Sequence, residues 1–256
     1  MNLQTFLNKN PRIAVALSGG VDSSYLLYAA KTAGCDVRAY FIKSQFQPEF
    51  ELQDATRLAH SLDVPLTVGT LDVLNDPNIA QNPHDRCYHC KTAIMSKLWE
   101  LARRDEITVL CDGTNADDDE INRPGMRALR EQGVASPLRD GGLTKADIRH
   151  LSKQAGLVTH DKPSYACLAT RIPTGTAITQ DILERIERAE NALFDMGFTD
   201  FRVRVIKQGD NLCAPQFFAR IQMPEDQWKA AASHRTEIQA ALQPDFEGVM
   251  LDLSTR

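Results

Sequence analysis

The stretch Ala16–Leu27, ALSGGVDSSYLL, connects an apolar run to a helical pattern through a loop of glycine, serine and aspartate. The run that leads into it, Ile13–Leu17, is typical of a buried strand, and we expect a helix from about Val21 to Ala33. Backbone amides at the start of a helix attract anions, and glycine lets a phosphate approach the backbone closely. The stretch therefore predicts a phosphate-binding loop between a strand and a helix.

The side chains of this loop suit ATP together with Mg²⁺. Gly19 and Gly20 expose backbone amides, and Asp22 is placed to help hold the cation. Hydroxyl groups that can donate to phosphate oxygens come from Ser18, Ser23 and Ser24. The loop lacks the Gly-Lys-Ser/Thr ending of a Walker A loop, and with it the lysine that grips the γ-phosphate. A plain strand-to-helix turn is the alternative, and the rarity of the pattern SGG-x-D-S disfavours it.

The first half of the chain alternates strand-like and helix-like segments. Further apolar runs lie at residues 36–42, 65–71 and 107–113. Between later segments, the string TKAD at Thr144–Asp147 has the form of a capping box, and Gly156 is placed as a C-terminal cap, so a helix is expected there. This alternation predicts an α/β fold, a parallel sheet with helices on both faces. Ligands of such sheets bind beyond the carboxyl ends of the strands.

The C-terminal part predicts a smaller second domain. A run rich in proline, threonine and glycine at residues 159–179 is typical of a long ordered loop. An amphipathic helix follows from Gln180 and ends at Gly197, and three alternating apolar runs after it are typical of strands. The expected domains are an α/β domain at residues 1–173 and an α+β domain for substrate binding or oligomerisation at residues 174–256.

Composition and charge limit the class of protein. The chain has 256 residues, 43% of them hydrophobic and 25% charged, which is typical of a folded protein. The net charge of -5 gives no overall excess of basic residues for a nucleic-acid backbone, so a nucleic-acid partner is not expected, with a local basic patch as the alternative. No apolar run reaches the roughly 20 residues that span a bilayer, and the N-terminus lacks the pattern of a signal peptide. We therefore expect a cytoplasmic protein without a membrane partner.

Three of the six cysteines call for a chemical explanation. Cys87 and Cys90 form a C-x-x-C pair in a polar segment, and Cys167 follows 77 residues after Cys90. The three could bind zinc with His84 or His89 as a fourth ligand, act in redox chemistry, or ligate an iron–sulfur cluster. Cys167 could instead act as a nucleophile, as a thiol or a persulfide. Three unrelated buried cysteines are the remaining alternative, which the polar surroundings disfavour.

Other polar residues are candidates for contacts with ATP or with its acceptor. A guanidinium group fits a phosphate bidentately, which makes Arg171 and Arg123 candidates for a substrate phosphate. A surface salt bridge is the alternative for Arg171. Lys91, directly after the C-x-x-C pair, is a further candidate. The turn after the strand that ends near Leu110 supplies Gly113 and Thr114 as candidates for ATP and Asn115 as a candidate for the substrate, and a role as ordinary turn residues is the alternative for Thr114 and Asn115.

The pattern SGG-x-D-S resembles the signature of the PP-loop ATP pyrophosphatases. Members of that superfamily cleave ATP between the α- and β-phosphates, transfer AMP to a carboxylate or carbonyl oxygen, and release pyrophosphate. A nitrogen or sulfur nucleophile then displaces AMP. The resemblance therefore implies ligase-like or sulfur-transfer chemistry and disfavours a kinase.

Further strings between about Arg12 and Phe198 resemble the LarE family, the ATP-dependent sulfur transferases that build the nickel-pincer nucleotide cofactor. They are NPHDRCYHCK, DGTNADDD, RPG, ASPLRDGGLTKADIR, DKPSYACLATRIPTGTAIT and LERIERAE. The resemblance implies adenylation of a carboxylate of pyridinium-3,5-biscarboxylic acid mononucleotide, followed by insertion of sulfur to give a thiocarboxylate.

The resemblance also assigns the cysteines. It implies that Cys167, in the motif ACLA-x-RIP, is the sulfur-bearing residue. Some members have only this cysteine and sacrifice its sulfur, whereas others also carry the C-x-x-C pair and resemble cluster-dependent enzymes. The presence of Cys87 and Cys90 favours the second form, with a [4Fe–4S] cluster on all three cysteines. The sulfur source stays open between the cluster, a persulfide and Cys167 itself, and a sulfur-donor protein or sulfide and a second copy of the chain are the expected partners.

The chain departs from the family pattern in two places. Gly209–Asp210 and Ala219–Ile221 form one compact run in the family but are separated here, and Gln222 replaces an acidic residue. These changes put in doubt any metal or substrate contact from the C-terminal domain. Thr170 stands where serine is usual and keeps the hydroxyl group.

Three other functions compete with sulfur transfer to a mononucleotide. A tRNA thiolase of the same superfamily can also use three cysteines and a cluster. An amide-forming PP-loop ligase would use the three cysteines as structural zinc ligands. A regulator that only binds a nucleotide or a metal would release no pyrophosphate.

Overall fold

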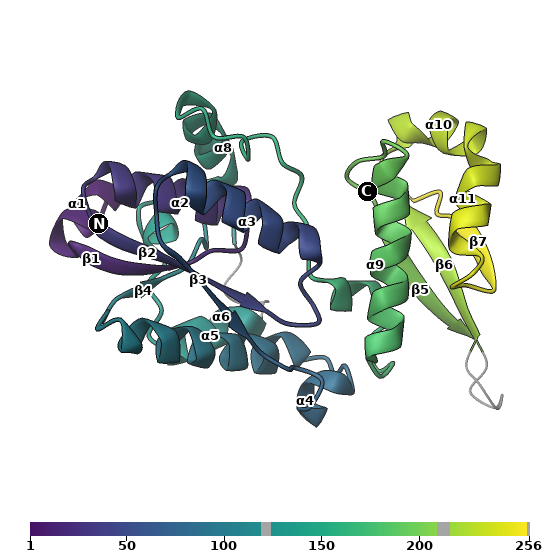
Figure 1. The fold of residues 1–256 in the computed structure, drawn as a ribbon, viewed down its shortest axis with the longest axis horizontal. Coiled ribbons are helices and arrows are strands. Elements are labelled where there is room, and N and C mark those ends of the chain that lie inside the picture. Colours follow the sequence, from purple (N-terminus) through teal and green to yellow (C-terminus); the bar gives the residue numbers. More distant parts are fainter. Residues whose placement is uncertain (119–123, 209–215, 255–256) are drawn as a thin grey trace. The chain divides into compact units, whose positions relative to one another are not determined.

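The chain forms two compact units in the computed structural model (Figure 1). The described residues are 1–118, 124–208 and 216–254. The first unit consists of Met1–Val73 and Asp85–Lys162, and the second of Leu74–His84 and Pro163–Arg256. The sequence-based division between residues 173 and 174 falls inside the second unit, and as a statement about domains it stays a prediction.

A parallel sheet forms the centre of the first unit, in the strand order β3-β2-β1-β4. Its strands are β1 (Arg12–Ala16), β2 (Asp36–Lys43), β3 (Leu66–Thr70) and β4 (Leu110–Cys111). Every pairing is parallel, from Arg12 opposite Asp36 to Val15 opposite Cys111. The α/β fold predicted from the alternation of strand and helix patterns is confirmed.

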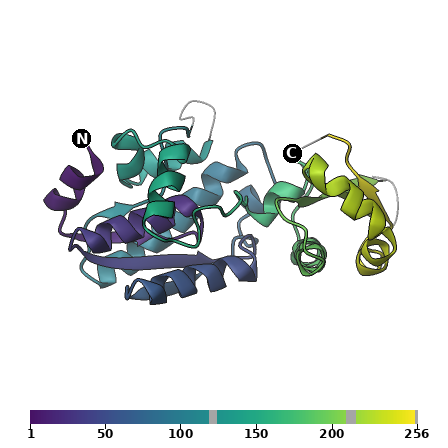
Figure 2. The ribbon, with the colours of Figure 1, turned by 90° about the horizontal axis from the view of Figure 1, so that it is seen from above.

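Helices cover both faces of this sheet. They are α1 (Leu3–Lys9), α2 (Val21–Thr32), α3 (Glu49–Ser61), α5 (Arg86–Arg104), α6 (Pro124–Glu131), α7 (Pro137–Asp140) and α8 (Lys145–Gln154). Side chains alternate across a strand, so Ile13 and Val15 of β1 join the core formed with α2, α3 and α8, whereas Ala14 joins the core formed with α5 and α6. Figures 1 and 2 show α2 and α3 side by side on one face.

Helix α8 begins with the capping box that the sequence predicts. The Thr144 hydroxyl accepts a hydrogen bond from the Asp147 amide at 3.1 Å, and the Asp147 carboxylate accepts one from the Thr144 amide at 3.0 Å. The helix ends before Gly156, whose φ of +71° is a conformation that favours glycine. The predicted helix between these two caps is confirmed.

The second unit contains a small mixed sheet. Its elements are α4 (Pro77–Ala80), η1 (Leu168–Arg171), α9 (Gln180–Asp195), β5 (Arg202–Gln208), β6 (Gln216–Gln222), η2 (Glu225–Gln227), α10 (Trp228–Ser233), α11 (Arg235–Leu242) and β7 (Gly248–Leu251). β5 pairs with β6 antiparallel, and β6 pairs with β7 parallel. The predicted apolar face of α9 is buried, at Ile182, Ile186, Ala189 and Leu193.

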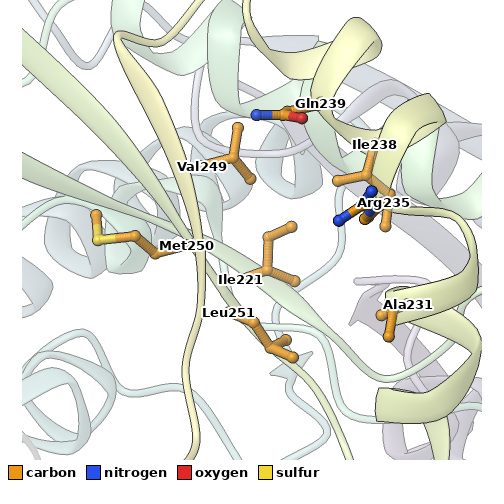
Figure 3. A pocket seen from close by; sticks show the side chains of 9 residues that line it. Ile221, Ala231, Arg235, Ile238, Gln239, Val249, Met250 and Leu251 are labelled. Carbon is orange, nitrogen blue, oxygen red and sulfur yellow. The ribbon is translucent and has the colours of Figure 1, made fainter.

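A hollow of about 350 Å³ lies between the helices α10 and α11 and the strands β6 and β7 (Figure 3). Its lining is mainly apolar and includes Ile221, Ile238 and Val249, with the polar side chains of Arg235 and Gln239. Of the site residues predicted from the sequence, none lies in this lining. Within the described ranges of the chain, no helix is long and apolar enough to cross a membrane.

Replacement of Thr144 by alanine tests the capping box. The hydroxyl and amide of Thr144 lower the pKa of Asp147, so the ionised carboxylate stabilises the fold above its unfolded pKa of about 4, and this contribution is lost as the pH falls through the lower folded pKa. We expect Thr144→Ala to lower the melting temperature by about 2–4 °C at pH 7, with a smaller difference below about pH 4. A difference between the two melting curves that does not change with pH would contradict the role of Asp147.

Candidate functional site: a phosphate loop and a cysteine-bearing segment

The predicted phosphate loop lies between the carboxyl end of β1 and the start of α2. Gly20 caps α2 without a side-chain hydrogen bond, which leaves the first amides of the helix available to an anion. Gly19 has φ of +74°, and a Cβ there would lie 2.9 Å from the carbonyl oxygen of Glu51. Because both the backbone angle and the space exclude a side chain, glycine is required at this position.

Hydroxyl groups of the loop hold its shape. The Ser23 Oγ accepts a hydrogen bond from the Ser18 amide at 3.1 Å and lies 3.0 Å from the Ser18 Oγ. The Ser24 Oγ donates to the Gly20 carbonyl at 2.7 Å. These serines brace the turn in its present form, and their predicted contacts with ATP stay a prediction.

Asp22 offers an oxygen that suits a cation. Its Oδ2 accepts a hydrogen bond from Lys145 Nζ at 2.5 Å. Its Oδ1 is buried and has no hydrogen-bond partner among the described residues. A buried carboxylate oxygen without a donor is costly, and a bound Mg²⁺ would satisfy it. The residues present therefore fit the predicted Mg²⁺ that accompanies ATP.

The turn after β4 lies directly against the start of α2. A Cβ on Gly113 would lie 2.7 Å from the Ser23 amide nitrogen, so the two backbones are in contact. Thr114 and Asn115 follow in the chain, and their side chains are buried. Both turns follow neighbouring parallel strands at their carboxyl ends, where the ligands of such sheets bind, and the structure brings them together.

Buried Asp112 organises this turn and was missed by the sequence analysis. Its carboxylate accepts hydrogen bonds from the hydroxyl of Thr114 and, at 2.7 Å, from the hydroxyl of Ser136. The Asn115 amide donates to Asp118 Oδ2 at 3.1 Å. The position of Asp112 directly after a buried strand, in a sheet whose ligands bind at strand ends, is the sequence pattern that could have indicated it.

Two lysines that the sequence analysis did not single out lie at the phosphate loop. Lys162 Nζ donates to the Gly19 carbonyl at 2.9 Å and to Asp54 Oδ2 at 2.5 Å. Lys145, at the first turn of α8, contacts Asp22 as described above. Both come from far along the chain, so a search for a lysine inside the loop could not find them. Together they place positive charge beside the loop, as a Walker A loop does with a lysine of its own.

The C-x-x-C pair lies at the N-terminal end of α5. Residues three apart on a helix share one side, so Cys87 and Cys90 are neighbours; Cys87 is exposed and Cys90 is buried. Arg86 Nη2 donates to Cys87 Sγ at 3.5 Å, which places a positive charge beside a sulfur. Lys91, the next residue, packs along α6, where a Cβ on Gly125 would lie 3.0 Å from its Cδ.

Cys167 and Arg171 belong to the second unit. Cys167 directly precedes the short helix η1 and is partly exposed. The Arg171 side chain is fully buried, and its Nε donates to Glu190 Oε1 at 2.8 Å. Burial opposes the charged form, but the hydrogen bonds and charge of Glu190 outweigh it and raise the pKa of Arg171. The predicted contact of Arg171 with a substrate phosphate stays a prediction.

The predicted metal ligands are divided between the units. Cys87 and Cys90 belong to the first unit and Cys167 to the second. In the part of the chain that the structure describes, no group of three or more His, Cys, Asp or Glu side chains is placed to hold a metal ion. The thiolate pair suits iron or zinc as a donor set. Arg123, a predicted substrate contact, and Gly209–Asp210 lie outside the described residues.

Comparison with known proteins agrees with the fold and the loop. Residues 11–73 match the family described as tRNA methyl transferase HUP domain. The parallel sheet, the phosphate loop and this match define the class of protein: it is a HUP-domain protein with the PP-loop of the ATP pyrophosphatases.

Relatives define the family within this class. The pyridinium-3,5-bisthiocarboxylic acid mononucleotide synthase of Lactiplantibacillus plantarum is 32% identical over 84% of this chain and 75% of its own length. Uncharacterized protein slr1717 of Synechocystis sp. is 34% identical, over 88% of this chain and 81% of its own length. The tRNA-specific 2-thiouridylase MnmA of Hahella chejuensis is 24% identical over 60% of this chain and 52% of its own length. The chain belongs to the LarE family of ATP-dependent sulfurtransferases.

Replacement of Lys162 by methionine tests the lysine at the phosphate loop. A hydrogen bond to a charged group contributes about 1.5–3 kcal/mol, so we expect the variant to bind an ATP analogue that cannot be cleaved between the α- and β-phosphates about tenfold to a hundredfold more weakly. Isothermal titration calorimetry measures this change. Lys153→Met, on the exposed side of α8, is the matched control and should bind as the unchanged protein does. Equal affinity of the two variants would contradict a role for Lys162.

Proposed function

We propose that this protein adenylates a carboxylate of pyridinium-3,5-biscarboxylic acid mononucleotide with ATP and then replaces a carboxylate oxygen with sulfur. The observation that carries the proposal is the phosphate loop at the start of α2, together with the buried oxygen of Asp22 that has no hydrogen-bond partner in the described part of the chain. The relative from Lactiplantibacillus plantarum, named as the bisthiocarboxylic acid mononucleotide synthase, supports this choice of acceptor.

In the first step the loop holds the phosphates of ATP. The free amides at the start of α2 and the ammonium groups of Lys145 and Lys162 stabilise the charge of the departing pyrophosphate. Mg²⁺, when bound, neutralises phosphate oxygens, and Asp22 would hold it. A carboxylate oxygen of the mononucleotide attacks the α-phosphorus, the bond to the β-phosphate oxygen breaks, and pyrophosphate leaves. The product is an acyl adenylate.

In the second step sulfur displaces AMP from the acyl adenylate. A carbon–sulfur bond forms at the carbonyl carbon, the carbon–oxygen bond to AMP breaks, and its electron pair leaves with the phosphate. Sulfide as the nucleophile gives the thiocarboxylate directly. Where the partly exposed Cys167 supplies the sulfur, its Sγ first forms a thioester; loss of the Cα proton and cleavage of the Cβ–Sγ bond then release the thiocarboxylate and leave dehydroalanine at residue 167. AMP is a much better leaving group than the original carboxylate oxygen, which is why ATP is consumed.

The finer proposal is that Cys87, Cys90 and Cys167 ligate a [4Fe–4S] cluster. The three thiolates would hold the cluster and leave one coordination position without a protein ligand, and the bound group would supply sulfide for the transfer. The two neighbouring thiols of α5 are of the ligand type that such a cluster takes. The Arg86 guanidinium beside Cys87 places a positive charge next to them. An external sulfur donor, either a protein or sulfide, and assembly of the chain into a homo-oligomer are parts of the same proposal.

Pyrophosphate release tests the proposed acceptor. We expect ATP to be converted to AMP and pyrophosphate when the biscarboxylic acid mononucleotide is present, and a coupled assay for pyrophosphate measures the rate. Unmodified tRNA is the matched alternative substrate, because a tRNA thiolase is also among the relatives. Stimulation by tRNA and not by the mononucleotide would overturn the proposal.

Anaerobic purification tests the cluster. We expect iron and acid-labile sulfide in the unchanged protein, and we expect Cys87→Ser and Cys90→Ser to lose most of both. Cys35→Ser is the control, since Cys35 lies in the first unit with its sulfur near the Leu7 and Asn10 carbonyls at 3.7 Å. Colourless protein that contains zinc after attempted cluster reconstitution would refute the cluster and favour structural zinc. Sulfur transfer without any metal would leave a persulfide or Cys167 itself as the source.

A further inference from the structure

The segment that carries Cys167 is attached to the second unit through a buried arginine. The Arg171 side chain has no exposed surface, and the Glu190 side chain is 2% exposed. Two hydrogen bonds join them, from Nε to Oε1 at 2.8 Å and from Nη2 to Oε2 at 3.1 Å. This is the bidentate pairing that a planar guanidinium makes with a carboxylate.

The remaining nitrogen of Arg171 reaches back to the cysteine segment. Nη1 donates to the Ala166 carbonyl at 2.7 Å, to the Thr170 Oγ1 at 3.0 Å and, more weakly, to the Cys167 carbonyl at 3.5 Å. The Thr170 hydroxyl in turn donates to the Cys167 carbonyl at 2.8 Å. Hydrogen bonds from Arg171 and Thr170 therefore fix the carbonyl groups on both sides of the Cys167 Cα.

Glu190 fixes the arginine to the body of the unit. Its carboxylate also accepts hydrogen bonds from the Val203 amide at 2.9 Å and from the hydroxyl of Tyr165. Glu190 lies on α9 and Val203 on β5, so one carboxylate ties the cysteine segment to a helix and a strand. The Arg171 guanidinium also lies over the Tyr165 ring, 4.4 Å from its centre.

We propose that Arg171, paired with Glu190, is a positioning residue that fixes the backbone of Cys167 for the sulfur-transfer step, and that it does not bind the substrate phosphate. The inference rests on the proposed function. All three nitrogens of the Arg171 guanidinium donate hydrogen bonds to groups inside the protein. The group therefore has no pair of N–H donors left to bind a phosphate bidentately. Lysine at this position would keep the charge, but a single ammonium group cannot serve the carboxylate and the loop carbonyls in three fixed directions.

The two steps of the reaction separate this role from others. Adenylation needs ATP, the phosphate loop and the mononucleotide, whereas formation of the carbon–sulfur bond also needs sulfur at Cys167 in line with the acyl adenylate. A small displacement of a reacting group costs much of its rate. Loss of positioning should therefore slow the second step and leave the first unchanged.

The test is Arg171→Lys in the full chain, with both steps measured. Exchange of labelled pyrophosphate into ATP in the presence of the mononucleotide reports adenylation, and formation of the thiocarboxylate reports sulfur transfer. We expect the exchange rate and the KM for the mononucleotide to match those of the unchanged protein, and thiocarboxylate formation to fall by about tenfold to a hundredfold. Glu190→Gln, which keeps the size of the side chain, should show the same split and serves where the lysine variant does not fold.

Arg188→Lys is the matched control. Arg188 is also on α9 and pairs bidentately with a carboxylate, that of Asp245, but this pair has no contact with the cysteine segment in the hydrogen bonds of the described residues. It should show no split. A higher KM for the mononucleotide in the Arg171 variant would overturn the proposal in favour of phosphate binding. An equal fall of both steps together with a lower melting temperature, or unchanged sulfur transfer, would overturn it as well. Absence of exchange in the unchanged protein would instead refute the proposed function on which it rests.

Discussion

The contact between the backbones of Gly113 and Ser23 is the constraint on which the nucleotide site depends. The turn after β4 and the first turn of α2 approach so closely that a methyl group at residue 113 would lie 2.7 Å from the Ser23 nitrogen. β1 and β4 are parallel neighbours, so their carboxyl ends meet at one edge of the sheet. The phosphate loop and the buried turn around Asp112 thus form one continuous surface at this edge of the sheet, built mainly from backbone and short side chains.

The positive charge at this surface comes from distant parts of the chain. The loop itself contributes a carboxylate, Asp22, and no cation, whereas Lys145 and Lys162 reach it from α8 and from the segment that follows. Each ammonium group pairs with an aspartate, Lys145 with Asp22 and Lys162 with Asp54. Phosphate groups bound at the loop would place further negative charge beside both of these ion pairs.

The sequence was sufficient for the fold class and for the elements with strong local patterns. The phosphate loop, the capping box at Thr144 and the buried face of α9 were all predicted, because each depends on residues close together in the chain. The two lysines, Asp112 and the burial of Arg171 were not, because each depends on contacts across many residues. Arg171 illustrates the difference: an arginine four residues after a cysteine gives no local indication that Glu190 will enclose it.

The central claim is that ATP activates a carboxylate oxygen so that sulfur can replace it. Mononucleotide labelled with a heavy oxygen isotope in its carboxylates, incubated with the protein, ATP and a sulfur source, tests this directly by mass spectrometry of the nucleotide product. The account predicts AMP that carries one labelled oxygen taken from the carboxylate. Unlabelled AMP, or ADP and phosphate as products, would contradict it.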